Sequence, residues 1–250
     1  MYSVKTVSFS PFDLNENIIK TIIGIGLTFV IIFILFLTYY VKLKKQKQNL
    51  IPTGYVFVFQ LYIEYIHNLV LQILGKKFEK ITPFFIYLFS YILISNTISI
   101  FGITNPTSSL SVTVSLGLVT FIGIFVVGIK YQRMSYFKKY TVNISTKNGK
   151  TIPVMVNPIN IAGQFAPLIS ISFRLWGNIF AGSLIIAMVL SATSSTVDSI
   201  LPFEFFDFFG LFALLPLHLY FDILSGVIQT LVFCLLTMVY WKMEANTDKK

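Results

Sequence analysis

One charged side chain stands alone in a long apolar stretch of the sequence. Arg174 is the only charged residue between Lys150 and Asp198, and it lies in the middle of the segment 169–184. A guanidinium keeps its proton at any physiological pH, so this charge is permanent. Placing it at mid-bilayer depth costs at least about 2.5–3.5 kcal/mol. A sequence that keeps such a charge there is expected to use it.

The residues that follow Arg174 are small or carry an amide. Asn178 comes four positions later and would share a helix face with the arginine, with Gly177, Ala181 and Gly182 close by. Small residues let another helix approach the backbone closely. We therefore expect this face to contact a partner.

A second polar group lies in the last apolar segment. His218, Asp222, Ser225 and Gln229 follow one another at i, i+4, i+7 and i+11, which predicts a continuous polar stripe on a helix. If this helix packed antiparallel to the one with Arg174, a fixed cation, an amide and an ionisable carboxylate would share a buried seam. Such a seam has the groups needed to move protons.

The composition is that of a polytopic membrane protein. Hydrophobic residues make up 55% of the 250 residues and charged ones 12%, with a mean hydropathy of +0.78. The single cysteine, Cys234, excludes an intramolecular disulfide, and two distant histidines do not predict a metal site. No cofactor is expected. The net charge of +9 lies in short loops between apolar spans, which favours a lipid bilayer over nucleic acid as the partner.

The apolar pattern predicts an all-α integral membrane protein with five spanning helices and one interfacial amphipathic helix. The expected spans are 21–41, 81–101, 110–129, 157–191 and 203–241, and the interfacial helix is 54–75. The last two spans exceed the bilayer thickness, so we expect them to be tilted or kinked and packed as an antiparallel hairpin.

The charges predict how the chain is oriented. All but three of the 19 basic residues fall on one side, including those in the loop 130–156 and the tail 242–250. The lead 1–20 and the acidic loop 192–202 fall on the other side. The positive-inside rule then places the N-terminus outside and the C-terminus in the cytoplasm. We expect a bacterial cell membrane, with the mitochondrial inner membrane as the alternative.

Three stretches carry a resemblance to a known family. FRLWGNIFAG at 173–182 resembles the RLFGNxxAG signature of subunit a of F-type ATP synthases, and IQTLVFCLLTMVY at 228–240 is similar to the family's IQAxVFxxLTxxY. A weaker match places Asn96 at the family's helix-three asparagine. The resemblance runs from about Pro52 to the last helix.

The resemblance implies a rotary proton translocator that is not an enzyme by itself. In the family, subunit a is the membrane stator beside a turning ring of c subunits, within a complex that also has b-type peripheral stalk subunits. Protons enter and leave through two half-channels, and an arginine between them lowers the pKa of the ring carboxylate as it passes. Arg174 takes that role by its position in the motif.

Other roles are carried over residue by residue. Asn178 and Gln229 match the polar neighbours of the arginine, and Asp222 matches the site of a glutamate or histidine in the external half-channel. Ser183 stands where many members carry an ionisable residue, so that channel depends on Asp222 with His218. The remaining expected positions are the ring contacts Gly177, Ala181 and Gly182 and the external entry residues Glu204 and Asp207.

Simpler roles stay open for each of these residues. Arg174 could snorkel to the interface, Asp222 could be its structural ion-pair partner, and His218 could be a packing residue. Asn178 and Gln229 could only tie helices together, because buried amides do so routinely. A secondary transporter with a midplane charged site is the alternative function, although repeat symmetry and short broken helices are not apparent. An intramembrane enzyme would need a nucleophile or metal motif, and none occurs.

Overall fold

The computed structural model describes residues 14–45, 54–101, 103–133, 136, 141–145, 151–156, 158–197 and 216–246. The elements in chain order are α1 (Leu14–Lys45), α2 (Tyr55–Ile73), η1 (Lys76–Ile81), α3 (Thr82–Thr97), η2 (Ile98–Phe101), η3 (Pro106–Ser108), α4 (Leu110–Gln132), β1 (Thr141–Ser145), β2 (Thr151–Val156), α6 (Pro158–Val197), η4 (Leu219–Ser225) and α8 (Gly226–Asn246).

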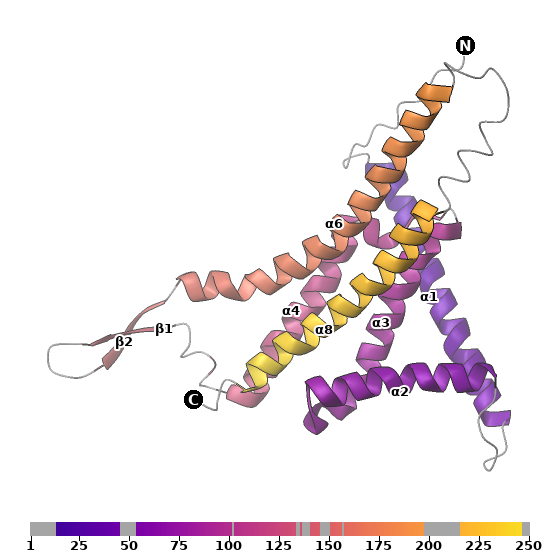
Figure 1. Cartoon of the computed structure of the whole chain (residues 1–250). Helices are drawn as coiled ribbons and strands as arrows, with labels where there is room; N and C mark the ends of the chain where they lie inside the picture. The colour runs from indigo at the N-terminus through magenta and orange to yellow at the C-terminus, as the bar shows by residue number, and fades with distance from the viewer. Residues whose placement is uncertain are drawn as a thin grey trace.

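Long apolar helices dominate the described part of the chain, which confirms the predicted fold class. Six of them are long and apolar enough to cross a membrane. One of the six is α2, the segment expected at the interface. Figure 1 shows α2 running crosswise at one end of α1 and α3 rather than alongside them.

Aromatic contacts fix α2 in this crosswise position. The Tyr55 hydroxyl donates to the Leu35 carbonyl of α1 at 2.9 Å, and the ring of Phe59 stacks on Tyr39 of the same helix. Farther along α2, the hydroxyls of Tyr62 and Ser90 lie 2.7 Å apart, which joins α2 to α3. The exposed stripe that includes Glu64 faces away from these contacts.

Helices α4, α6 and α8 pack closely because glycines face bulky side chains. A Cβ on Gly117 of α4 would collide with the Ser172 hydroxyl of α6, and one on Gly123 would collide with the Trp241 ring of α8. The Trp241 indole also donates to the Thr120 carbonyl at 3.1 Å. Small residues at helix contacts are typical of membrane bundles. These three helices form the unit that positions the site.

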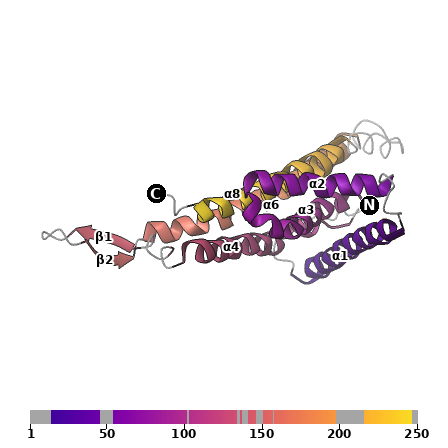
Figure 2. The ribbon, with the colours of Figure 1, turned by 90° about the horizontal axis from the view of Figure 1, so that it is seen from below.

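Two parts of the structure differ from the expected layout. An antiparallel β-hairpin, β1 with β2, occupies part of the loop predicted at 130–156, and both views show it projecting away from the helices (Figures 1 and 2). The many β-branched residues in TVNIS and TIPVMV favour strands. Helix α6 also continues to Val197, beyond the predicted end at 191, because no glycine or proline interrupts 192–197.

The length and shape of α6 follow from its sequence. Its 40 residues would span about 60 Å if straight, twice the thickness of the hydrocarbon core. Pro167 lies inside the helix, and Figure 1 shows α6 bent rather than straight. A proline inside a helix removes one backbone hydrogen bond and allows such a bend.

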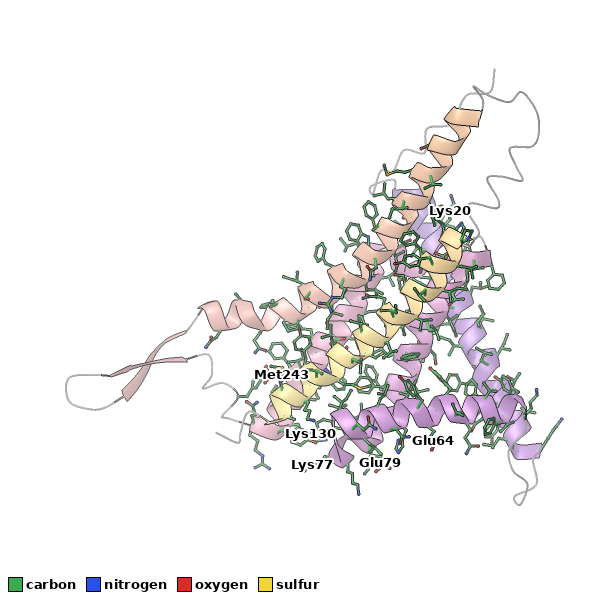
Figure 3. All side chains as sticks on the ribbon, viewed as in Figure 1. Lys20, Glu64, Lys77, Glu79, Lys130 and Met243 are labelled. Atoms are coloured by element: carbon green, nitrogen blue, oxygen red, sulfur yellow. The ribbon has the colours of Figure 1, made fainter. Side chains whose placement is uncertain are left out.

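The charged residues mark the two ends of the bundle. Figure 3 shows Lys77, Lys130 and Met243 toward the end where α2 lies, and Lys20 toward the opposite end. The basic residues of α1, Lys42, Lys44 and Lys45, fall in its last turn, beside the start of α2. The end at α2 is therefore the basic end.

Candidate functional site

Arg174 lies on the open face of α6. Ile171 and Leu175 are buried against the rest of the chain, whereas Arg174, Asn178 and Ala181 are exposed. Within the described part of the chain, Arg174 has no hydrogen-bond or ion-pair partner. The arginine is therefore presented outward by a helix whose opposite side is fixed by packing.

The surface around Arg174 is apolar. Phe173 is 51% exposed, and Ile169, Ile185 and Met188 of the same helix are also exposed. Gly177 is half-buried, and no other part of the described chain would contact a Cβ placed on it. A permanent charge thus lies within an apolar surface that has room for a closely packed neighbour.

An amide contact joins the arginine's helix to α8. The Asn178 Nδ2 donates to the Gln229 Oε1 at 2.6 Å. Gln229 is only 4% exposed, and its own Nε2 is buried without an acceptor in the described chain. The pair fixes the position of α6 relative to α8 one helical turn from Arg174.

The carboxylate of Asp222 pairs with histidine and not with the arginine. Asp222 Oδ2 lies 2.8 Å from His218 Nδ1, and the Asp222 side chain is 16% exposed. Among the described residues, no ion pair links Asp222 to Arg174. The open possibility of an Arg174–Asp222 ion pair is therefore excluded in this structure.

Asp222 lies in η4, a π-helical segment and not an ordinary α-helical turn. A π-helix is wider because its hydrogen bonds run from i to i+5, and such segments are frequent at functional sites. In this region the exposed positions are 219–220, 223–224 and 227–228. His218, Asp222, Ser225 and Gln229 therefore share the less exposed face, as their spacing predicts.

Asn96 has a tying role in this structure. Its side chain is buried, donates to the Gly226 carbonyl at 3.4 Å and accepts from the Thr107 hydroxyl at 2.8 Å. Gly226 also accepts from Thr230 at 2.7 Å. Asn96 thus connects α3 to the junction between η4 and α8, where the helix changes from π to α.

Gly182, expected to contact the ring, and Ser183, expected in the proton path, make contacts within this chain. Gly182 is buried, and a Cβ on it would meet the Phe221 side chain of η4 at 3.2 Å, so the close approach it permits lies within this chain. The Ser183 hydroxyl donates to the Phe180 carbonyl at 2.9 Å, back along its own helix. Glu204 and Asp207, expected at the external entry, lie outside the described residues.

A polar cluster at the basic end was not anticipated. Glu244, near the end of α8, accepts from Gln132 of α4 and from Gln164 of α6. Glu244 lies beyond 241, the predicted end of the last helix. The run WKMEAN is compatible with a helix and extends α8 to Asn246.

Comparison with known proteins assigns the chain to a family. The family model described as ATP synthase A chain matches residues 23–242. The chain belongs to this family. The ATP synthase subunit a of Mycoplasmoides gallisepticum is 47% identical over 227 residues, covering 88% of this chain and 76% of that protein. That of Mycoplasma pneumoniae is 39% identical, covering 90% and 78%.

A third relative is named for a different ion. The "ATP synthase subunit a, sodium ion specific" of Propionigenium modestum is 30% identical over 236 residues, covering 88% of this chain and 72% of that protein. Membership in the ATP synthase A chain family makes the protein a membrane subunit of the F-type ATP synthase, which sets aside the transporter and intramembrane-enzyme alternatives. Within the described residues, His, Cys, Asp and Glu form no group able to hold a metal ion.

Proposed function

We propose that this subunit is the stator against which a ring of c subunits turns, and that Arg174 is the charge it presents to the ring carboxylates. The observation that carries this proposal is an exposed, unpaired arginine on an otherwise apolar surface of a membrane helix. Facing lipid, that charge would cost at least about 2.5–3.5 kcal/mol. A partner that brings its own carboxylate to this face removes most of that cost.

The fixed charge of Arg174 would make the ring release its proton. An opposite charge nearby favours the ionised carboxylate, so the pKa of each ring carboxyl falls as it passes Arg174. The guanidinium cannot lose a proton itself, which stops protons from crossing directly between the two half-channels. A buried lysine can be deprotonated and would allow that leak.

Asp222 and His218 would serve the external half-channel. Their contact at 2.8 Å forms an imidazole–carboxylate pair, a combination that can take up and pass on protons. His218 directly precedes η4, Asp222 lies within it, and both side chains are partly exposed. Because η4 comes before α8, the pair lies at the end of this helix away from Glu244. The Ser183 hydroxyl donates to the Phe180 carbonyl of the same helix, and serine supplies no ionisable group. Asn178 and Gln229 hold the two helices in register beside this path.

The proposal extends to the partners of the subunit and to its orientation in the membrane. It would bind the c ring and b-type peripheral stalk subunits, and it would have no catalytic activity by itself. The basic end at α2 would face the cytoplasm of a bacterial cell, with α2 on the membrane surface.

Disulfide cross-linking within the assembled complex tests the ring contact. We expect Ala181→Cys, on the face of Arg174, to cross-link to a cysteine placed beside the ring carboxylate. Leu118→Cys is the control, because Leu118 is also exposed but lies on another helix, α4. The buried Cys234 should not react. Cross-linking of Leu118→Cys in place of Ala181→Cys would contradict the proposed orientation.

A further inference from the structure

A cavity of about 170 Å³ lies between α4, α6 and α8 toward the basic end of the bundle. Its lining includes Gly163, Gln164 and Pro167 of α6 and Tyr240 and Glu244 of α8. Figure 3 shows Lys130 and Met243, which belong to α4 and α8, at this end. The cavity therefore opens where the cytoplasmic surface is proposed to be.

Two amides hold a carboxylate at the edge of this cavity. Glu244 Oε1 accepts from Gln164 Nε2 at 3.4 Å, and Oε2 accepts from Gln132 Nε2 at 3.3 Å. Gln132 Nε2 also donates to the Glu244 backbone carbonyl at 2.5 Å. Donors from two other helices thus orient the Glu244 side chain and leave its half-buried carboxylate beside the cavity.

The wall formed by α6 offers a further acceptor to water. Pro167 has no N–H group, so the carbonyl of Gly163, four residues earlier, lacks its usual helical donor. A Cβ added to Gly163 would meet nothing within 4 Å, so open space surrounds this backbone. A cavity of this volume, lined by the Gln164 amide and the Glu244 carboxylate, is roomy and polar enough to hold several waters.

The same wall leads to Arg174. Gly163, Pro167, Ser170 and Arg174 follow at i, i+4, i+7 and i+11, so they lie along one face of α6. Ser170 is exposed between the cavity and the arginine. Along the helix axis, Pro167 lies about 10 Å from Arg174.

We propose that this cavity is the cytoplasmic mouth of the second half-channel and that Glu244 is the last proton acceptor of the protein before the cytoplasm. The proposal rests on the stator function given above. A proton released from a ring carboxyl near Arg174 passes through water to a carboxylate oxygen of Glu244. Glu244 then gives that proton to cytoplasmic water and returns to its ionised form. Gln132 and Gln164 keep the carboxylate at the cavity edge between these steps.

Replacing the carboxylate by its neutral isostere tests the role of Glu244. In the complete complex in proteoliposomes, we expect Glu244→Gln to lower the rate of proton-driven ATP synthesis about tenfold. This is below the roughly 10²–10⁴-fold effect of a catalytic acid–base group, because water can replace an acceptor at a channel mouth. Glu64→Gln, which removes an exposed carboxylate of α2, is the matched control and should leave the rate unchanged. An unchanged rate in Glu244→Gln would overturn the assignment of Glu244.

Thiol labelling tests the cavity independently of Glu244. In inverted vesicles, a membrane-impermeant, negatively charged thiol reagent should modify Gly163→Cys and slow proton flux severalfold, whereas Gly26→Cys on α1 should leave flux unchanged. The parent chain, with only the buried Cys234, is the background. The assignment of the cavity to the proton channel would be overturned if the reagent did not modify Gly163→Cys. It would also be overturned if the modified variant kept the full proton flux. Neither result tests the stator function. That proposal would be contradicted by a different result, namely normal ATP synthesis after Arg174 is replaced.

Discussion

The amide pair between α6 and α8 predicts an asymmetric effect of mutation. Asn178 is exposed and donates to Gln229, which is 4% exposed and already has an unpaired Nε2. Asn178→Leu would leave both polar atoms of the Gln229 amide buried without partners, at about 1–3 kcal/mol. Gln229→Leu would instead remove the buried amide and leave only an exposed one. We expect it to cost less, near the ~0.6 kcal/mol average for hydrogen bonds between membrane helices.

Thermal unfolding of the purified complex in detergent measures this difference. A change of 1 kcal/mol shifts the midpoint by roughly 2–4 °C in a chain of this size. Asn178→Leu should therefore lower the midpoint for subunit a more than Gln229→Leu does. The double variant should resemble Gln229→Leu, because the two residues act as one contact. A larger loss for Gln229→Leu than for Asn178→Leu would refute the claim that the Gln229 amide is the buried partner of the pair.

Three further substitutions follow from single contacts. Asp222→Asn, which removes the ionisable partner of His218, should slow proton uptake from the external side in vesicles; unchanged flux would leave Asp222 with a structural role only. Gly182→Leu would overpack the contact with Phe221 and should destabilise the subunit by about 1–3 kcal/mol, seen as reduced assembly. Gly226→Ala places a Cβ 3.0 Å from Asn96 and should lower the unfolding midpoint, whereas Gly26→Ala, in open space on α1, should not. Equal unfolding midpoints for these two alanine variants would contradict the close contact between Gly226 and Asn96.

Features that depend on a regular period could be predicted from the sequence. The apolar runs predicted the membrane helices, and the i, i+4 spacing placed Asn178 beside Arg174 and Asp222 beside His218. These predictions succeed because side chains four apart share a helix face whatever surrounds them. The motif around Arg174 also indicated the family from the sequence alone.

Features that depend on tertiary packing or a change of period could not be predicted. The π-helical form of η4 could not be predicted, because the polar spacing from His218 to Gln229 fits an α-helix equally well. Gly182 shares the motif with Ala181 but faces Phe221, and only the crossing of α6 with η4 decides this. Glu244 contacts Gln132, 112 residues away in sequence, so no local signal connects the two. The β-hairpin has short strands in a basic segment, and this pattern resembles that of a loop.

Proton-driven ATP synthesis by Arg174→Lys is the most direct test of the central claim. The lysine keeps a positive charge and similar length but can lose its proton when desolvated. The account predicts that the variant subunit is inserted and assembled at normal levels, yet coupled synthesis is abolished. Synthesis at the normal rate in Arg174→Lys would contradict the claim that a charge unable to lose its proton separates the two half-channels.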